Sequence, residues 1–289
     1  LFFTQKGKCF WMRVFEIPEG SRTSKGRAIQ NLINIEQDDK VKAFICTQDL
    51  KDEEYINKHY VIMATKQGQV KKTSLEQYSR PRTNGINAIT IKEDDELLEA
   101  KLTTGDSQVM IAVRSGKAIR FEEEKTRPMG RGASGVRGIT LGGPKDEVIG
   151  MITVDDQESD ILVVSENGYG KRSSIDDYRI TNRGGKGVKT INISEKTGEL
   201  VAIKNVTDND DLMIINKSGV AIRMAVEDLR VMGRATQGVR LIKVREEDSI
   251  AAVAKVMHDE DQIDAVDAEA SDDLAQDGAS ESTPEQTEE

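Results

Sequence analysis

The chain has 289 residues, of which 37% are hydrophobic and 32% charged, a composition that suits one large or two ordinary globular domains. Its net charge of −10 is uneven, because residues 259–289 hold 13 Asp and Glu and no Lys or Arg, which leaves residues 1–258 a net charge of +3. Apolar runs of at most five residues exclude a membrane-spanning helix, and two cysteines and two histidines argue against a disulfide framework, a His-dependent triad or a multi-His metal site. We therefore expect a cytoplasmic protein with a mildly basic body.

Five repeated units follow one another from Leu1, which lies inside a strand-like run and suggests a fragment of a longer protein. Each unit contains an apolar strand, a turn glycine, a basic strand, an Arg-containing loop with a second glycine, and another strand. The turn glycines are Gly7, Gly68, Gly116, Gly168 and Gly219, and the second glycines are Gly26, Gly85, Gly135, Gly187 and Gly238. Repeats of about 50 residues are typical of radial architectures.

The second unit shows the strands that we expect in each repeat. They are Val41 to Ile45, Tyr60 to Ala64, Gln69 to Thr73 and Ile86 to Ile91. The counterparts of its second strand, at 109–113, 161–164 and 212–215, are continuously apolar, which favours a position covered on both faces. Helical periodicity is nearly absent. The pattern predicts an all-β, propeller-like fold of four-stranded blades over residues 1–258.

Basic residues recur at fixed offsets from the glycines, and isoleucines follow the second glycine by four positions in the last four units. In a ring, residues at equal offsets lie at one radius, so we expect a basic belt. Its predicted members are Arg22, Lys25, Arg27, Lys71, Lys72, Arg80, Arg82, Arg120, Arg127, Arg131, Arg137, Lys171, Arg172, Arg179, Arg183, Lys186, Lys189, Arg223, Arg230, Arg234 and Arg240.

A regular basic belt matches the phosphate backbone of duplex DNA. The 12 aromatic residues give few stacking platforms for single strands, and no helix carries a base-reading set, so contact to the backbone with weak sequence selectivity is expected. Two alternatives remain open. The charges are unrelated solvated side chains, or the propeller is a non-catalytic scaffold whose basic loops bind acidic protein partners.

Other motifs are interpreted structurally. Gly130 to Gly135 matches G-x-G-x-x-G, but a strand is expected after it where a dinucleotide site needs a helix. The acidic clusters at 36–39, 93–96 and 246–248 recur between blades, which favours solvated turns over metal sites. Trp11 and the pair Phe2-Phe3 are expected to pack in the core or at a blade edge. No cofactor or metal is expected in this chain.

Several runs resemble the C-terminal domain of the DNA gyrase A subunit. They are Asn167-Gly168-Tyr169-Gly170-Lys171-Arg172, Gly135-Val136-Arg137-Gly138-Ile139, Gly233-Arg234-Ala235-Thr236-Gln237-Gly238-Val239 and Glu19-Gly20-Ser21-Arg22-Thr23-Ser24-Lys25-Gly26-Arg27. The resemblance covers residues 1–257. It implies a β-pinwheel, in which blades exchange strands and duplex DNA wraps around the basic rim, so that an ATP-dependent type IIA topoisomerase introduces negative supercoils.

The resemblance also implies a bacterial, chromosome-associated setting. Its partners would be double-stranded DNA, the gyrase B subunit and the cleavage domain of gyrase A in an A2B2 holoenzyme, which would supply ATP and Mg²⁺ sites and the catalytic tyrosine. The family's box Gln-Arg-Arg-Gly-Gly-Lys-Gly is not seen, and its nearest echo is Asn182-Arg183-Gly184-Gly185-Lys186-Gly187. Its absence leaves the corresponding domain of topoisomerase IV as an alternative, with decatenation or relaxation as the activity.

Residues 259–289 form an acidic C-terminal segment. They hold few apolar residues and 13 carboxylates, too little apolar surface to bury against the cost of folding. We expect a disordered tail, which either keeps the protein soluble or competes with DNA for the basic belt.

Overall fold

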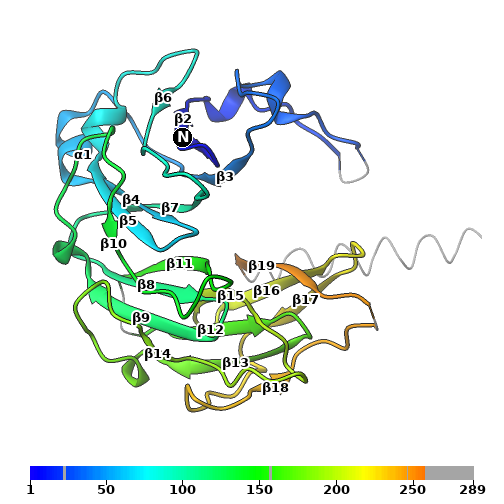
Figure 1. The fold of residues 1–289 in the computed structure, drawn as a ribbon. Helices are drawn as coiled ribbons and strands as arrows, with labels where there is room; N and C mark the ends of the chain where they lie inside the picture. The colour runs from blue at the N-terminus through cyan, green and yellow to red at the C-terminus, as the bar shows by residue number, and fades with distance from the viewer. Residues whose placement is uncertain (22–23, 156–157, 246, 258–289) are drawn as a thin grey trace, which may run out of the picture.

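The computed structural model describes residues 1–21, 24–155, 158–245 and 247–257, and the regular secondary structure in these ranges is almost entirely short antiparallel strands. The strands form five sheets, here called blades 1 to 5, which follow one another around an arc (Figure 1). This confirms the predicted all-β, propeller-like fold. The acidic segment at 259–289 lies outside the described residues.

Blades 1 to 4 each have an inner, a second, a third and an outermost strand, and blade 5 has the first three of these among the described residues. In that order, blade 1 contains β3 (Val41–Phe44), β1 (Phe2–Thr4), β2 (Lys8–Phe10) and β6 (Ile86–Asn87); blade 2 contains β7 (Leu97–Thr103), β4 (Tyr60–Thr65), β5 (Gln69–Ser74) and β10 (Val136–Arg137). Blade 3 contains β11 (Val148–Val154), β8 (Gln108–Val113), β9 (Lys117–Glu122) and β14 (Val188–Lys189). Blade 4 contains β15 (Leu200–Val206), β12 (Asp160–Ser165), β13 (Tyr169–Ser174) and β18 (Val239–Arg240), and blade 5 contains β19 (Ile250–Met257), β16 (Asp210–Asn216) and β17 (Ala221–Ala225).

The strands of one sequence unit are shared between two blades. In the second unit, β4 and β5 belong to blade 2, whereas the strands before and after them, β3 and β6, complete blade 1. The predicted strand at 86–91 is therefore shortened to the two residues of β6, because the chain leaves blade 1 at that point to reach its own blade. The same exchange supplies the outermost strands β10, β14 and β18, as the family resemblance implied.

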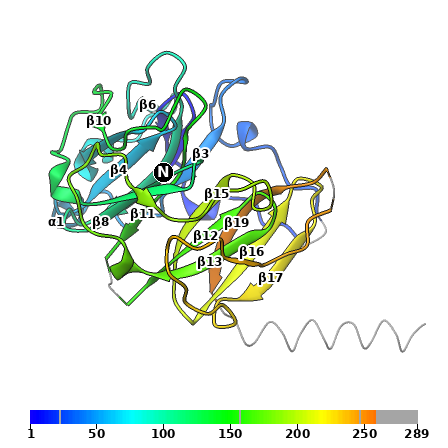
Figure 2. The same ribbon diagram turned by 60° about the horizontal axis from the view of Figure 1, so that its bottom comes forward.

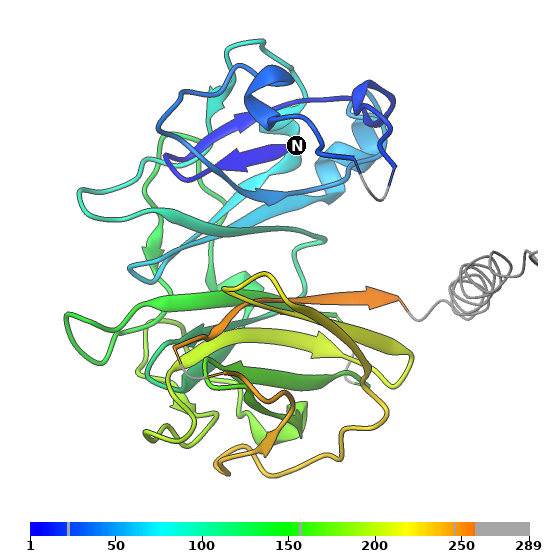
Figure 3. The ribbon, with the colours of Figure 1, turned by 90° about the vertical axis from the view of Figure 1, so that its right-hand side faces the viewer.

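The inner strands join the blades around the arc. β11, β15 and β19 lie side by side in order (Figures 1 and 2), and β7 contacts β3 and β11. Figure 3 shows the blades following one another from the blue first blade to the yellow and orange fifth blade. The second strands are buried as predicted, with Val109, Ile161 and Leu212 fully inaccessible to solvent.

The glycines and isoleucines of the repeat form the contact between successive units. Each turn glycine has a positive φ, and a Cβ on Gly7 would lie 2.4 Å from the carbonyl oxygen of Ile89 in the next unit. Gly168 and Ile242 meet in the same way. A side chain at the turn glycine would prevent this close contact with the isoleucine backbone. The recurrent glycine and isoleucine therefore form one contact between successive units.

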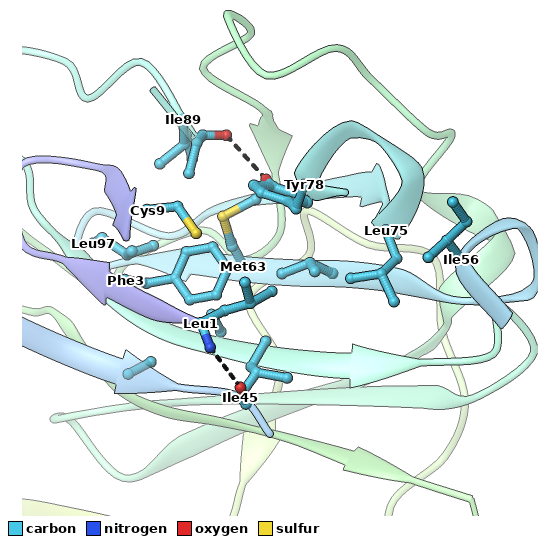
Figure 4. Packing of buried hydrophobic residues seen from close by; sticks show 14 residues of the cluster. Leu1, Phe3, Cys9, Ile45, Ile56, Met63, Leu75, Tyr78, Ile89 and Leu97 are labelled. Atoms are coloured by element: carbon cyan, nitrogen blue, oxygen red, sulfur yellow. Dashed lines mark hydrogen bonds between the residues drawn. The ribbon is translucent and has the colours of Figure 1, made fainter. Parts of the chain in front are cut away.

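The largest core cluster lies between blades 1 and 2. Phe3, Met63, Leu75 and Tyr78 pack together there (Figure 4), with the rings of Phe3 and Tyr78 in an edge-to-face arrangement 5.8 Å apart. Trp11 packs against this cluster and donates from Nε1 to the carbonyl oxygen of Tyr78, 2.9 Å away. The predicted packing roles of Trp11 and Phe3 are confirmed.

Short helical segments connect the strands. They are α1 (Glu53–Lys58) and the 3₁₀ turns η1 (Val14–Glu16), η2 (Ile29–Asn31), η3 (Leu75–Tyr78), η4 (Glu123–Lys125) and η5 (Ile175–Asp177). Apolar residues of η3 and η5 are buried, whereas Val14 and Phe15 of η1 are more than 70% exposed. Within the described ranges, no helix has the length and apolarity to cross a membrane.

Candidate nucleic-acid interface

Three exposed basic residues occupy equivalent places on the outermost strands of blades 2, 3 and 4. Arg137, Lys189 and Arg240 are the second residues of β10, β14 and β18. Each lies opposite the residue that directly follows a turn glycine, because the register pairs them with Gln69, Lys117 and Tyr169 respectively. The recurrence predicted from sequence is therefore also a recurrence in space, on the outer edge of successive sheets.

A second recurrent set lies where the chain passes from the third strand into the loop. Arg127, Arg179 and Arg230 are exposed, and each precedes a residue that forms a parallel bridge with the third strand of the preceding blade. The other exposed members of the predicted belt are Lys25, Arg27, Arg80, Arg82, Lys186 and Arg223. Arg22 lies outside the described residues.

The loop arginines Arg131, Arg183 and Arg234 are half-buried. Arg183 donates from Nε to the carbonyl oxygen of Lys125 at 2.9 Å and from one terminal nitrogen to that of Arg137 at 3.1 Å. Arg234 makes the equivalent bond to the carbonyl oxygen of Lys189 at 2.7 Å. Since a guanidinium has five N–H donors, these bonds hold each arginine in place and leave donors for a further acceptor.

Two hollows flank the loop of the fourth unit. The larger, about 640 Å³, is lined by Lys125, Arg127 and Arg183 together with Glu124, Met129 and Val136. The smaller, about 280 Å³, includes Arg179, Lys186 and the backbone of Gly185 and Gly187. Both are open to solvent and have basic side chains in their lining, which can bind an anionic group.

Five predicted members of the belt do not lie on its surface. Lys71, Lys72, Arg120, Lys171 and Arg172 are between 0% and 8% exposed, so the expectation that they add to an exposed belt is wrong. The physical reason is the strand exchange. The Arg-containing loop of the next unit covers the residue three positions after the turn glycine, as at Lys71 and Lys171. The residue four positions after it points to the opposite face of the strand, where the segment that follows the third strand of the next unit covers Arg120 and Arg172.

The buried arginines connect neighbouring blades. Arg120 donates to the carbonyl oxygens of Ile175 (2.8 Å) and Tyr178 (3.0 Å), in the η5 segment of the next unit. Arg172 pairs with Asp160 of its own blade at 2.6 Å and with Asp208 of the next unit at 2.5 Å, and it also reaches the carbonyl oxygen of Val226 in the next unit. Their fixed offset from the turn glycine therefore reflects inter-blade contact, which repeats with the same period as an outer surface would.

Lys72 has a buried carboxylate as its partner. Its Nζ lies 3.4 Å from Glu123 and 4.8 Å from the ring centre of Tyr60. A paired, buried ammonium group of this kind serves the fold and does not present its charge to a polyanion.

Sequence reasoning missed three basic residues of this surface. Lys125 lines the larger hollow, Lys117 is the register partner of Lys189, and Lys196 lies with Arg240 against the ring of Tyr169. None of them recurs at a fixed offset in all units. The signal that could have found Lys117 is its position directly after a turn glycine, opposite a residue of the predicted belt.

The remaining motifs have structural roles. Gly130 to Gly135 is followed by the two-residue strand β10 and no helix, so it is not a dinucleotide-binding turn. Among the residues that the structure describes, no group of three or more His, Cys, Asp or Glu is arranged to hold a metal ion.

A family model described as "DNA gyrase C-terminal domain, beta-propeller" matches the chain in five segments, residues 1–48, 59–104, 108–155, 159–207 and 210–257. The gyrase A protein of Staphylococcus epidermidis is 46% identical over 262 residues, which are 90% of this chain and 29% of that protein. That of Staphylococcus aureus strain MRSA252 is 44% identical over 263 residues, 91% of this chain and 29% of that protein. The chain thus spans under a third of the length of these relatives.

Two solved structures share the fold. The C-terminal domain of DNA topoisomerase IV has a TM-score of 0.79 at 24% identity and covers 89% of this chain and 78% of that one. The DNA gyrase A C-terminal domain has a TM-score of 0.76 at 23% identity, with coverages of 89% and 81%. At these identities the likeness concerns the fold.

Proposed function

The chain belongs to the DNA gyrase C-terminal domain family, and from this membership we propose that it binds duplex DNA along its outer edge and wraps it. The exposed basic side chains on the outermost β-strands, and those in the loops before these strands, would contact successive phosphates of the duplex. Most of these contacts would be to the backbone, so binding would depend strongly on salt and weakly on base sequence.

The observation that carries the proposal is the equal placement of Arg137, Lys189 and Arg240 on three successive blades. A duplex carries its charge at regular intervals, so a ligand that follows the arc meets the same arrangement at each blade. Arg183 and Arg234, which are hydrogen-bonded to backbone carbonyl oxygens of the outermost strands, extend the arrangement into the loops. An acidic protein partner would not require this regularity.

We further propose that the chain acts as the non-catalytic DNA-wrapping part of a cytoplasmic bacterial gyrase. The gyrase B subunit and the cleavage domain of gyrase A would supply the catalytic tyrosine, ATP hydrolysis and Mg²⁺ in an A2B2 assembly. Identities of 46% and 44% to gyrase A proteins favour gyrase over topoisomerase IV, because the likeness to the latter rests on fold.

The proposal can be tested with the 289-residue chain and duplexes of increasing length. The dissociation constant, measured by fluorescence anisotropy at several salt concentrations, should fall with duplex length until the edge is filled. Its logarithm should change by about 0.9 per phosphate contact for each tenfold change in salt. Ligation of nicked circles in the presence of the chain should shift the linking number if the DNA is wrapped.

A matched pair of triple variants separates the interface from overall charge. The first variant removes three positive charges from the outermost β-strands by the substitutions Arg137→Gln, Lys189→Gln and Arg240→Gln. The second removes three positive charges from the inner strands β3, β7 and β19 by the substitutions Lys42→Gln, Lys101→Gln and Lys255→Gln. Only the first set should weaken binding and lower the salt dependence by about three contacts. Equal effects of both sets, or tight binding to one short site at all salt concentrations, would contradict wrapping along this edge.

A further inference from the structure

Lys71 and Lys171 are two buried lysines at the same place in blades 2 and 4, three positions after the turn glycines. Their exposures are 0% and 1%. Lys72 and Arg172, their neighbours, pair with carboxylates, but the hydrogen-bond partners of Lys71 and Lys171 are neutral oxygens. A buried ammonium group is costly, so its retention at two equivalent positions calls for a physical reason.

Each lysine has a partner in the Arg-containing loop of the next unit. Lys71 donates to the carbonyl oxygen of Arg131 at 2.8 Å and also to that of Ala88. Lys171 donates to the carbonyl oxygen of Gly233 at 2.7 Å and lies 3.4 Å from the hydroxyl of Thr236. Each lysine therefore reaches from beneath into a loop that carries a half-buried arginine, Arg131 or Arg234.

The geometry at the second glycine fixes this arrangement. A Cβ on Gly135 would lie 3.3 Å from the Cβ of Lys71, and one on Gly238 would lie 3.3 Å from the Cβ of Lys171. The loops thus rest directly on the lysine stems. The ammonium groups bind backbone oxygens of the loop from the covered side, and those oxygens would repel a phosphate if they faced it.

The other units show what replaces the lysine. Ile119 and Ile222 occupy the same register in units 3 and 5, and Phe10 occupies it in unit 1. The loop that covers Ile119 contains a lysine, Lys186. The loops that cover Lys71 and Lys171, at 130–135 and 233–238, contain no lysine. An apolar residue is therefore compatible with the fold at this position, so the fold alone does not require a lysine there.

We propose that Lys71 and Lys171 are positioning residues of the DNA interface, which hold backbone oxygens of the Arg131 and Arg234 loops inward and place a positive charge beneath each loop. The inference rests on the proposed DNA binding. The lysines touch no DNA. They act through the loops, whose arginines then meet the phosphates in a fixed orientation.

The surroundings make both lysines sensitive to pH. Burial, together with Arg131, lowers the pKa of Lys71 to about 8, while Tyr78 and Cys9 nearby have pKa values raised by burial and do not titrate in that range. Burial also lowers the pKa of Lys171 to about 8; Asp177 opposes and Arg234 adds to that shift, and Tyr178 has a pKa raised to about 12. Between pH 7 and 9 both lysines therefore lose most of their charge.

Stability and DNA affinity should change in opposite directions over this range. The pKa of each lysine is lower in the folded chain than in the unfolded chain, where it is about 10.4. The unfolded state therefore binds more protons above pH 8, so these groups make the fold more stable as the pH rises from 8 to about 10. DNA affinity should fall over the lower part of the same range, because the loops lose the charge that positions them.

The experiment compares the wild-type chain with the double variant Lys71→Met, Lys171→Met and with the matched control Ile119→Met, Ile222→Met. Affinity for a long duplex and urea unfolding are measured at pH 7, 8 and 9. Wild type and control should lose affinity by about five- to tenfold between pH 7 and 9, because the neutral amines keep only the weaker, uncharged form of their hydrogen bonds to the loops and no longer place a positive charge beneath them. The lysine variant should bind at pH 7 as weakly as wild type does at pH 9, with a flat profile and no rise of stability.

The outcomes distinguish the two proposals. If the wild-type chain binds no duplex at any pH, the DNA-binding function is wrong. If it binds with an affinity that does not change between pH 7 and 9, or if the folded lysine variant matches the control at every pH, the positioning role is wrong and the function stands. The wild-type profile decides the question even if the lysine variant does not fold.

Discussion

The guanidinium of Arg234 donates a 2.7 Å hydrogen bond to the carbonyl oxygen of Lys189, and so ties the loop of the fifth unit to the outermost strand of blade 3. Arg183 repeats the bond one unit earlier, to Arg137. The exposed strands and the loops of the proposed interface are therefore one connected structure. A change in one loop should therefore affect the position of the basic side chain on the outermost strand to which that loop is bonded.

Replacing Arg234 by alanine should lower the free energy of unfolding by about 1 kcal/mol, the typical net value of one hydrogen bond, and should also weaken DNA binding. Arg230→Ala on the same loop is the control, because Arg230 is exposed and a surface substitution usually costs less than about 0.5 kcal/mol. Urea unfolding measures the stability of both variants, and fluorescence anisotropy measures their affinity for duplex DNA. Equal stabilities of the two variants would show that the bond to Lys189 adds nothing to the fold.

Replacing Gly238 by alanine should damage the fold. Its φ is +81°, and a Cβ there would lie 2.4 Å from the carbonyl oxygen of Gly170. Strain in the backbone and the clash together should cost about 2–4 kcal/mol. Gly233→Ala is the matched control in the same loop, since its Cβ would meet nothing within 4 Å. Thermal unfolding should show a clear loss for the first variant and almost none for the second.

The sequence predicted the blades well because the residues that form them repeat. The turn glycines and the isoleucines such as Ile89 mark contacts that occur once per unit, and a period is visible in one chain alone. Strand exchange is not visible in this way. The residues of β3 and β6 have the pattern of strands whichever blade they join, so the sharing of the second unit between two blades came only from the family resemblance.

The predicted basic positions recur in the structure, but several of them are buried. Arg137 and Arg172 recur equally well, yet one is exposed and the other is 8% exposed. A fixed offset from a glycine reports that the position repeats, and an inter-blade contact repeats as regularly as an outer edge does. Separating the two needs the identity of the covering loop, which for Arg172 comes from a segment more than 50 residues away.

The two cysteines should differ sharply in reactivity. Cys46 is exposed, whereas Cys9 is fully buried and its pKa is raised by burial to about 12. At pH 8 the thiolate of Cys9 is scarce and covered, so a disulfide reagent should label one thiol per native chain and a second only after unfolding. A Cys46→Ser variant should lose the fast reaction. Labelling of both thiols at one rate in the native chain would contradict the packing of blade 1.

The acidic segment at 259–289 lies outside the described residues, and its charge alone supports a prediction. It carries 13 carboxylates and is joined to a body of net charge +3. Tethering therefore keeps it at high effective concentration near the exposed basic side chains of the outer edge. If it competes with DNA there, removing it should tighten binding, most at about 0.01 M salt, where the Debye length is about 30 Å. The same segment added as a free peptide should restore little of the competition, because the effect depends on the tether. The dissociation constants of the 289-residue chain and of residues 1–258 measure this directly, and equal values at low salt would favour a segment that serves only solubility.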